Sequence, residues 1–208
     1  MREQEKKSKE QLILEVAESE FFSKGFDGTR TVVIAQKAGV THAMLHYYFR
    51  TKEQLFDRII SDKFELISQM VLSVLGNSEL PLIERLREGI ASHFDLVAAN
   101  PLLPRFLITE MLPHPERYHF MYEKLNSIRQ LYIDLQKSVD EAAAQGVIER
   151  VDVMMLLTSI LSLNVFPIIS SQFILQMVGE VGQFDQTQFL AARKQETIEM
   201  IMRRITKK

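Results

Sequence analysis

The stretch AGVTHAMLHYYFRTK, residues 38–52, gathers most of the side chains in this sequence whose type and spacing suit chemistry. His42 and His46 are four residues apart, which places two imidazoles on one helical face, where they can ligate zinc or form hydrogen bonds. No glutamate follows His42 and no third ligand stands nearby, so we expect no metal here. Tyr47 and Tyr48 come next, and a helix this short cannot bury every aromatic residue on one face.

Two short helices must position these side chains. Gly39 and Val40 allow a tight turn between a helix that follows Thr31 and a helix that Thr41 can cap. A small core is expected from Ile34, Val40 and Leu45, closed by Phe49. This geometry is that of a helix-turn-helix, whose second helix can read bases and phosphates in a major groove. The outward face of that helix would present six residues: Thr41, His42, Ala43, His46, Tyr47 and Tyr48.

The charge around this motif favours a phosphate-bearing partner. The whole chain has a formal net charge of −2, yet residues 28–52 contain no Asp or Glu. The cationic residues in that window are Arg30, Lys37, Arg50 and Lys52. A local excess of positive charge attracts phosphate, and Lys52 would stand in the first turn of a helix, where free backbone N–H groups add to its effect.

The composition indicates a globular protein of one or two domains. The chain has 208 residues, of which 46% are hydrophobic, and it contains no cysteine. It therefore has no disulfide framework and no cysteine nucleophile, and its charged first residues do not resemble a secretory signal. We expect a cytoplasmic protein. No nucleophile elbow, phosphate loop or plausible carboxylate pair is present, so we expect neither an enzyme nor a cofactor.

Helical periodicity dominates the chain, which predicts an all-α fold of about nine helices. The expected helices cover residues 8–24, 31–38, 41–49, 52–75, a segment after Pro81 to 99, 101–112, 115–145, 153–179 and 187–205. We divide the chain into a helix-turn-helix domain, residues 1–51, and a larger helical domain for effector binding and dimerisation, residues 52–208. The helix from Lys52 links the two.

The segment from Val153 to Gly179 carries no charged residue and is long enough to cross a bilayer. Polar residues such as Asn164 and Gln172 interrupt it, and acidic residues flank it, unlike most membrane spans. We therefore interpret it as a helix buried between neighbours and expect no membrane association.

The sequence GFDGTRTVVIAQKAGVTHAMLHYYFRTKEQLF, residues 25–56, resembles the N-terminal signature of the TetR family of bacterial transcriptional regulators. That signature contains Ile-Ala, Ala-Gly-Val, an aromatic run and Lys-Glu-x-Leu in this order. The resemblance covers about 50 residues, from Ile13 to Ile60. It implies a homodimer that binds a palindromic DNA operator and releases it when a small effector binds.

The resemblance also assigns roles to single residues. Thr31 falls where the family contacts a phosphate, His42 and Ala43 where it contacts bases, and His46, Tyr47, Tyr48 and Lys52 where it contacts the DNA backbone. With Arg30 and Thr41 these complete the predicted DNA-binding set. Two positions depart from the pattern. Val32 stands where some members place a base-reading polar residue, and His46 replaces the usual tyrosine.

The C-terminal part is expected to bind a largely apolar effector. Large flexible apolar residues suit such a cavity, and we select Phe94, Phe106, Met111, Met121 and Phe166 as candidates. Helices near 152–178 and 187–205 would form the dimer seam. The resulting hypothesis is a ligand-responsive transcriptional repressor. The alternative is an all-helical protein-interaction module in which the HYYF run, residues 46–49, anchors a protein partner.

Overall fold

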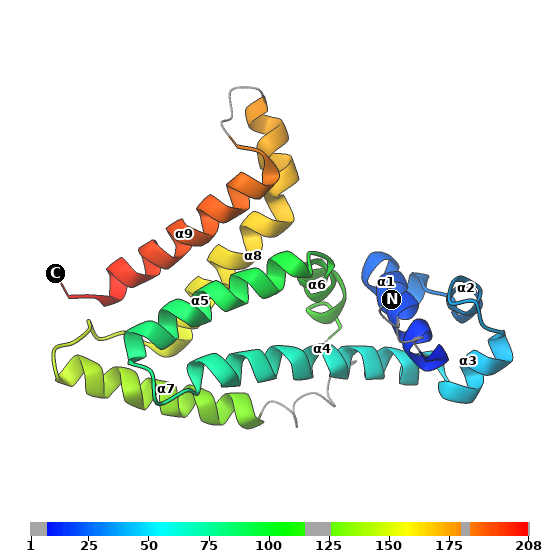
Figure 1. Cartoon of the computed structure of the whole chain (residues 1–208), viewed down its shortest axis with the longest axis horizontal. Helices are drawn as coiled ribbons and strands as arrows, with labels where there is room; N and C mark the ends of the chain where they lie inside the picture. Colours follow the sequence, from blue (N-terminus) through cyan, green and yellow to red (C-terminus); the bar gives the residue numbers. More distant parts are fainter. Residues whose placement is uncertain (1–7, 115–125, 180–183, 208) are drawn as a thin grey trace, which may run out of the picture. The chain divides into compact units, whose positions relative to one another are not determined.

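The computed structural model describes residues 8–114, 126–179 and 184–207, and these residues form nine α-helices (Figure 1). Their bounds are α1 Lys9–Gly28, α2 Thr31–Lys37, α3 His42–Tyr48, α4 Lys52–Leu75, α5 Leu82–Ala99, α6 Leu102–Phe106, α7 Asn126–Ala144, α8 Val153–Val178 and α9 Gln186–Ile205. A single π-helical turn, η1 Leu107–Met111, follows α6. The predicted all-α fold is confirmed. The first part of the expected helix 115–145 lies outside the described residues.

Two compact units divide the chain. One combines Met1–Leu66 with Arg105–His119, and the other combines Ile67–Pro104 with Phe120–Lys208. Helix α4 thus supplies its first part to the N-terminal unit and its last turns to the C-terminal unit. These units are defined by packing. The division expected at residue 51, between a DNA-binding part and an effector-binding part, concerns function and stays a prediction.

In the N-terminal unit, α1 is interrupted at Gly25, whose φ of 74° and ψ of 175° are not helical. The hydroxyl of Thr29 donates to the carbonyl oxygens of Glu20, at 3.1 Å, and Gly25, at 2.8 Å. The backbone N–H of Phe26 donates to Oε2 of Glu110 in η1 at 3.1 Å. The turn favours glycine for its backbone conformation, and a Cβ atom at Gly25, which would lie 2.2 Å from Oε1 of Glu110, would displace that carboxylate.

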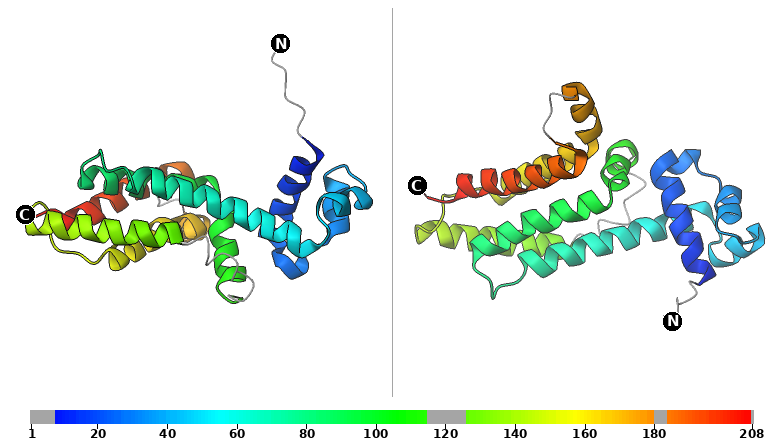
Figure 2. Two further views of the ribbon diagram at one scale, coloured as in Figure 1. Left: turned by 90° about the horizontal axis from the view of Figure 1, so that it is seen from below. Right: turned by 45° about the horizontal axis from the view of Figure 1, so that its top comes forward.

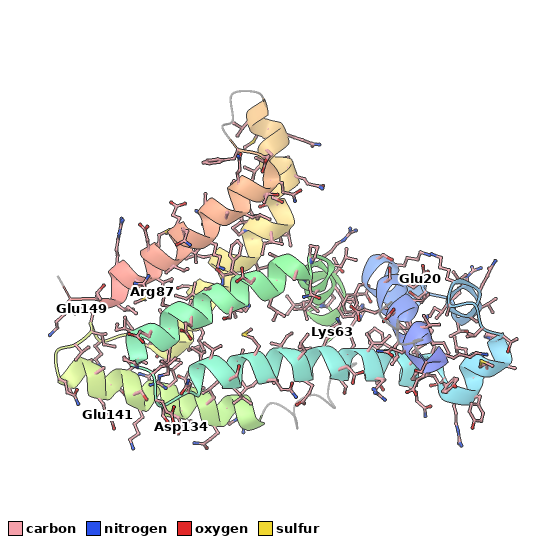
Figure 3. The ribbon with its side chains drawn as sticks, viewed as in Figure 1. Glu20, Lys63, Arg87, Asp134, Glu141 and Glu149 are labelled. Carbon is pink, nitrogen blue, oxygen red and sulfur yellow. The ribbon has the colours of Figure 1, made fainter. Side chains whose placement is uncertain are left out.

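Phenylalanine rings form much of the core of the N-terminal unit. Phe21 packs edge-on against Phe56 with ring centroids 5.0 Å apart, and Phe22 stacks on Phe106 at 4.7 Å. All four rings are buried. Lys63 of α4, labelled in Figure 3, also pairs with Glu18 of α1 at 2.7 Å. These contacts join α1, α4 and the segment after Pro104 into one body that carries α2 and α3.

In the C-terminal unit, α8 and α9 pack along each other and α5 packs against both (Figures 1 and 2). The core is apolar and combines side chains from these helices with side chains from α7 and the end of α4. Its most deeply buried members include Leu86, Ile90, Leu135, Val139, Ile148, Leu156, Ile201 and Ile205. The N–H of Glu149 donates to the carbonyl oxygen of Ile205 at 2.7 Å and ties the α7–α8 connection to the end of α9.

Helix α8 is the uncharged segment, and the single chain leaves much of it uncovered. It is the one helix in the described part of the chain that is long and apolar enough to cross a membrane, and 33% of its most apolar window is buried. Exposed large side chains occur in both halves of this helix, and four of those in its second half share one face. Phe166, Ile169, Phe173 and Met177 are 61%, 43%, 67% and 69% exposed. The predicted burial of this helix is therefore only partial within one chain.

The turn at Gly25 gives a stability prediction. Replacing Gly25 by Ala should lower the free energy of unfolding by about 1–3 kcal/mol, because a side chain is strained at this backbone conformation. The new methyl group would also displace the Glu110 carboxylate from the Phe26 N–H. Thermal unfolding followed by circular dichroism measures the change.

Gly28→Ala is the matched control, because Gly28 does not have a positive φ and its Cβ would meet Lys24 Cβ at an ordinary 3.4 Å. We expect this variant to be at least as stable as the natural chain. Equal effects of the two substitutions would contradict the account of the turn.

Candidate nucleic-acid interface

Helices α2 and α3 form the predicted helix-turn-helix. Gly39, with φ 65°, turns the chain between them, and the hydroxyl of Thr41 caps α3 by accepting from the N–H of Met44 at 3.2 Å. Leu45 is completely buried and Phe49 is 6% exposed. Because these residues hold one face of α3 in the core with Ile34, the opposite face is left to solvent.

All six residues predicted on the outward face of this motif are exposed: Thr41, His42, Ala43, His46, Tyr47 and Tyr48. Tyr47 is 82% exposed and Tyr48 is 39% exposed, and their rings meet edge to face with centroids 5.5 Å apart. Phe49 is buried, as expected. An aromatic side chain as open as Tyr47 contributes little to the fold of the free chain, so its place on this surface suggests recognition of a partner.

The two histidines form a directed chain of hydrogen bonds. Nδ1 of His46 lies 3.1 Å from the carbonyl oxygen of Arg50, which only accepts, so Nδ1 carries a proton. In the neutral ring Nε2 of His46 is then an acceptor, and Nε2 of His42, 3.1 Å away, donates to it. The hydroxyl of Thr31 lies 3.1 Å from the same His42 nitrogen. The three polar groups are thus held together across α2 and α3, within reach of one ligand.

This pair alone is an incomplete metal site. Within residues 8–114, 126–179 and 184–207, no group of three or more His, Cys, Asp or Glu side chains is placed to hold a metal ion.

A buried carboxylate changes the charge expected for the motif. Glu20 of α1 is 4% exposed and accepts from the ammonium groups of Lys24 and Lys37, each at 2.6 Å (Figure 3). These two lysine hydrogen bonds hold the pKa of Glu20 below its ordinary value. Lys37 therefore connects α2 to α1 and is largely neutralised. The sequence window 28–52 missed this partner, because Glu20 lies outside it.

The remaining cations lie at the edges of the motif. Arg30, the residue before α2, and Arg50, after α3, are exposed. Lys52 opens α4 and its ammonium lies 4.5 Å from the ring centroid of Phe26, a cation–π contact that positions it. The hydroxyl of Thr51 caps the same helix by accepting from the N–H of Gln54 at 3.2 Å. These cations flank α3, where phosphates of a groove-bound duplex would lie.

Val32 is 58% exposed at the start of α2. It has no hydrogen-bonding group for a base edge, and its methyl groups suit only an apolar contact such as a thymine methyl.

Of the five candidate effector residues, the three whose side chains the structure describes lie in different surroundings. Phe94 is buried in a small cluster with Val97 and Ile168, whereas Phe106 is part of the aromatic core of the N-terminal unit. Phe166 is 61% exposed on α8. Met111 lies in η1, and its side chain is not among those described. Met121 lies outside the described residues.

The C-terminal unit contains a different cavity, of about 270 Å³. Side chains from the end of α4 and from α5, α7 and α8 line it, among them Met70, Leu86, Ile90, His93, Leu157 and Ile160. Sequence reasoning missed this set because its members are ordinary core residues of four helices. His93 was the detectable signal, since it is an ionisable residue on the inner face of an amphipathic helix.

Comparison with known proteins decides the family. Residues 13–59 match the model of the bacterial regulatory proteins of the tetR family, and residues 83–201 match a tetracyclin repressor-like C-terminal domain. The chain belongs to the TetR family. The first match contains the whole helix-turn-helix, and the second contains most of the C-terminal unit. The TetR family consists of DNA-binding transcriptional regulators, and this chain is one of them by membership.

Solved TetR-family structures share the fold over nearly the whole chain. The ketosteroid transcriptional regulator KstR2 of Mycobacterium tuberculosis matches with a TM-score of 0.72 and 16% identity, covering 98% of each chain. FadR of Bacillus subtilis, solved with stearoyl-CoA, matches at 0.60 and 18%, covering 92% of this chain and 96% of that one. AibR, solved with isovaleryl coenzyme A and operator DNA, matches at 0.62 and 22%, covering 91% and 97%.

The exposed tyrosine gives a test of the interface. Tyr47→Ala should lower affinity for a DNA target at least tenfold, about 1.4 kcal/mol, while the thermal unfolding temperature stays within a degree or two. Fluorescence anisotropy and circular dichroism measure the two quantities.

The control for this test is Phe49→Ala, which removes a buried ring and should cost about 3–5 kcal/mol of stability. A Tyr47→Ala protein that unfolds as early as Phe49→Ala would show that the tyrosine serves the core.

Proposed function

We propose that this protein is a ligand-responsive transcriptional repressor of the bacterial cytoplasm, without catalytic activity. In this proposal a homodimer binds a palindromic operator through its two α3 helices and leaves it when a small, largely apolar effector occupies the C-terminal unit. The observation that carries the proposal is the outward face of α3, where exposed histidine, tyrosine and threonine side chains sit on a firmly buried support.

The DNA-binding set is Arg30, Thr31, Thr41, His42, Ala43, His46, Tyr47, Tyr48 and Lys52. His42 and Ala43 stand in the first turn of α3, the part of a recognition helix that meets base edges. The tyrosines and the flanking cations suit phosphate contacts. A dimer places two such helices about one helical turn of DNA, roughly 34 Å, apart. The two-fold symmetry of the dimer makes the operator a palindrome.

The exposed stripe on α8 supports dimerisation through α8 and α9. Phe166, Ile169, Phe173 and Met177 follow one another at spacings of three and four residues, so they lie on one helical face. An isolated chain leaves this face partly exposed to water, whereas complete burial of a large apolar side chain is worth about 1.5–3 kcal/mol and the rest of that burial is still to be gained. A second copy offers an identical stripe, which suits a two-fold interface.

The cavity of about 270 Å³ supports an apolar effector, since it is enclosed by leucine, isoleucine, valine and methionine side chains of four helices. The structural neighbours FadR and AibR were solved with acyl-coenzyme A molecules, which are ligands with an apolar part.

Two segments of the polypeptide chain connect the units and can couple effector binding to DNA binding. Helix α4 begins beside the motif at Lys52 and ends in the cavity wall at Val74 and Leu75. The chain leaves α5 and, from Arg105 on, joins the N-terminal unit, where Glu110 accepts from the Phe26 N–H. An effector releases DNA only to the extent that it binds the two arrangements of the dimer with different affinity.

The alternative function, a protein-interaction module, also uses the exposed tyrosines of α3. The two functions differ in electrostatics. DNA binding releases counterions and therefore weakens steeply as salt rises, whereas a mainly aromatic protein contact does not.

The proposed function predicts that the purified protein retains particular genomic DNA fragments, and that log affinity falls linearly with log salt by about 0.9 per phosphate contact. Lys52→Ala should reduce that slope by about 2 in a dimer, which loses one phosphate contact in each protomer. Selection of fragments followed by anisotropy titrations measures both. Retention without sequence preference, or binding that is insensitive to salt, would contradict the proposal.

Dimerisation is tested separately by Phe173→Glu, which places a charge in the middle of the exposed α8 stripe. We expect the natural chain to sediment as a dimer at micromolar concentration and this variant as a folded monomer, because a buried unpaired charge costs several kcal/mol. Ile133→Glu is the control, since Ile133 is 51% exposed on α7, away from the stripe. A dimer that survives Phe173→Glu but not Ile133→Glu would place the interface elsewhere.

A further inference from the structure

His93 is the polar exception in the wall of the C-terminal cavity. The other described residues that line this cavity have apolar side chains, apart from Gly89, which has none. A pocket of this kind takes its specificity from the few polar groups it contains, because the apolar wall accepts many shapes. The position of the proton on the His93 ring therefore decides whether this residue offers a ligand a hydrogen-bond donor or an acceptor.

Asn164 of α8 fixes that protonation state. Its side chain is fully buried, and its Nδ2 lies 3.0 Å from the carbonyl oxygen of Ile90 and 3.0 Å from Nδ1 of His93. A carbonyl oxygen only accepts, so the atom that faces Ile90 must be the amide nitrogen, and the flipped amide is excluded. The same nitrogen then donates its second hydrogen to Nδ1 of His93, which must be unprotonated.

A neutral imidazole with an unprotonated Nδ1 carries its proton on Nε2. Burial lowers the pKa of His93 below its ordinary value, which keeps the ring neutral near pH 7. Nε2 makes no hydrogen bond with the residues that the structure describes. The ring thus holds one fixed N–H donor on a residue that lines the cavity.

The contact between Asn164 and His93 leaves a buried polar atom without a hydrogen bond in the described part of the chain, and a purely structural role for Asn164 does not explain why. Oδ1 of Asn164 is buried and has no hydrogen-bond partner within the described ranges. A buried amide oxygen in that state destabilises the folded chain, because it gave up its hydrogen bonds to water. A leucine at this position of an apolar helix would avoid the cost, but it would leave the His93 ring free to change its proton arrangement.

We propose that the Nε2–H of His93 is the polar anchor of the cavity and selects an apolar effector that carries a neutral carbonyl acceptor, such as a ketone, ester or thioester. The inference rests on the proposed function, because it places the effector in this cavity. A purely hydrocarbon ligand would leave Nε2–H without a partner. A carboxylate is disfavoured, because pairing it with an imidazolium needs a proton on Nδ1, where the Asn164 N–H already points.

The first test is the proton position itself, read from two-bond proton–nitrogen correlations of the full chain labelled with ¹⁵N-histidine. The His93 signals are identified by their loss in His93→Phe. We expect a single neutral ring with the proton on Nε2 at pH 7, and a mixture of proton arrangements in Asn164→Leu. A proton on Nδ1 or an imidazolium in the natural chain overturns the inference.

The second test uses three probes of nearly equal shape: 4-phenyl-2-butanone, n-butylbenzene and 3-phenylpropionate. An apolar cavity of about 150 Å³ can hold benzene, so one of about 270 Å³ has room for a benzene ring with a short chain. Isothermal titration calorimetry gives the affinity of each probe. We expect the ratio of ketone affinity to butylbenzene affinity to fall roughly tenfold in His93→Phe, equivalent to about 1.4 kcal/mol.

Two further variants complete the design. Thr197→Val alters a buried hydroxyl outside the cavity lining and should keep the ketone preference of the natural chain. Asn164→Leu should raise the relative affinity of 3-phenylpropionate, because Nδ1 can then take a proton.

The outcomes separate the two claims. If the ketone and butylbenzene both bind and His93→Phe leaves the ratio of their affinities unchanged, the anchor is wrong while the effector cavity stands. If the natural chain prefers 3-phenylpropionate to the ketone, the choice of a neutral carbonyl is wrong. If none of the three probes binds, the cavity is not an effector site, and that part of the proposed function fails together with the inference.

Discussion

Burial of one side of α3 is the constraint on which the DNA-binding account depends. Leu45 and Phe49 fix that side against the support formed by α1 and α2, and a helix with one face buried has a fixed opposite face. Other contacts fix α1 and α2 in turn. Glu20 of α1 pairs with Lys37 of α2, and the phenylalanine core joins α1 to α4. The position of the exposed tyrosines is thus set mainly by buried residues.

The C-terminal unit follows the same physical logic with a different result. Its helices have more apolar surface than one chain can cover, since α8 keeps four large side chains exposed along one face while its other face enters the core. The apolar packing also leaves a cavity, and the contact of His93, a residue of its wall, with Asn164 is the basis of the donor proposed for it. In the proposed function, the excess apolar surface serves dimerisation and the incomplete packing serves ligand binding.

The sequence predicts the fold well because its helix boundaries are marked by local chemistry. Thr41 and Asp152 cap helices with their side chains, Gly25 and Gly39 adopt positive φ at turns, and the expected start of α4 at Lys52 is the observed one. These signals act between residues close in sequence, so no tertiary knowledge is needed to read them. The outward face of α3 is predicted for the same reason, since its periodicity is a property of one helix.

What the sequence does not predict is set by contacts between distant residues. Phe106 has the composition of a ligand-pocket residue, yet it packs on Phe22 of α1, more than eighty positions away, because the segment after Pro104 returns to the N-terminal unit. The partner of Lys37 is a carboxylate outside the basic window, and the Asn164 amide meets His93 across two helices. Such pairings depend on helix packing, which periodicity alone does not determine.

The central claim, that the outward face of α3 enters the groove of DNA, is tested most directly by photo-crosslinking. A photoreactive amino acid is placed at Ala43, in the first turn of α3, and at Ile133, which is exposed on α7 of the other unit. The account predicts efficient crosslinking to bases of a retained DNA fragment from position 43 and none from position 133. Crosslinks that form from position 133, or equally from both positions, would contradict it.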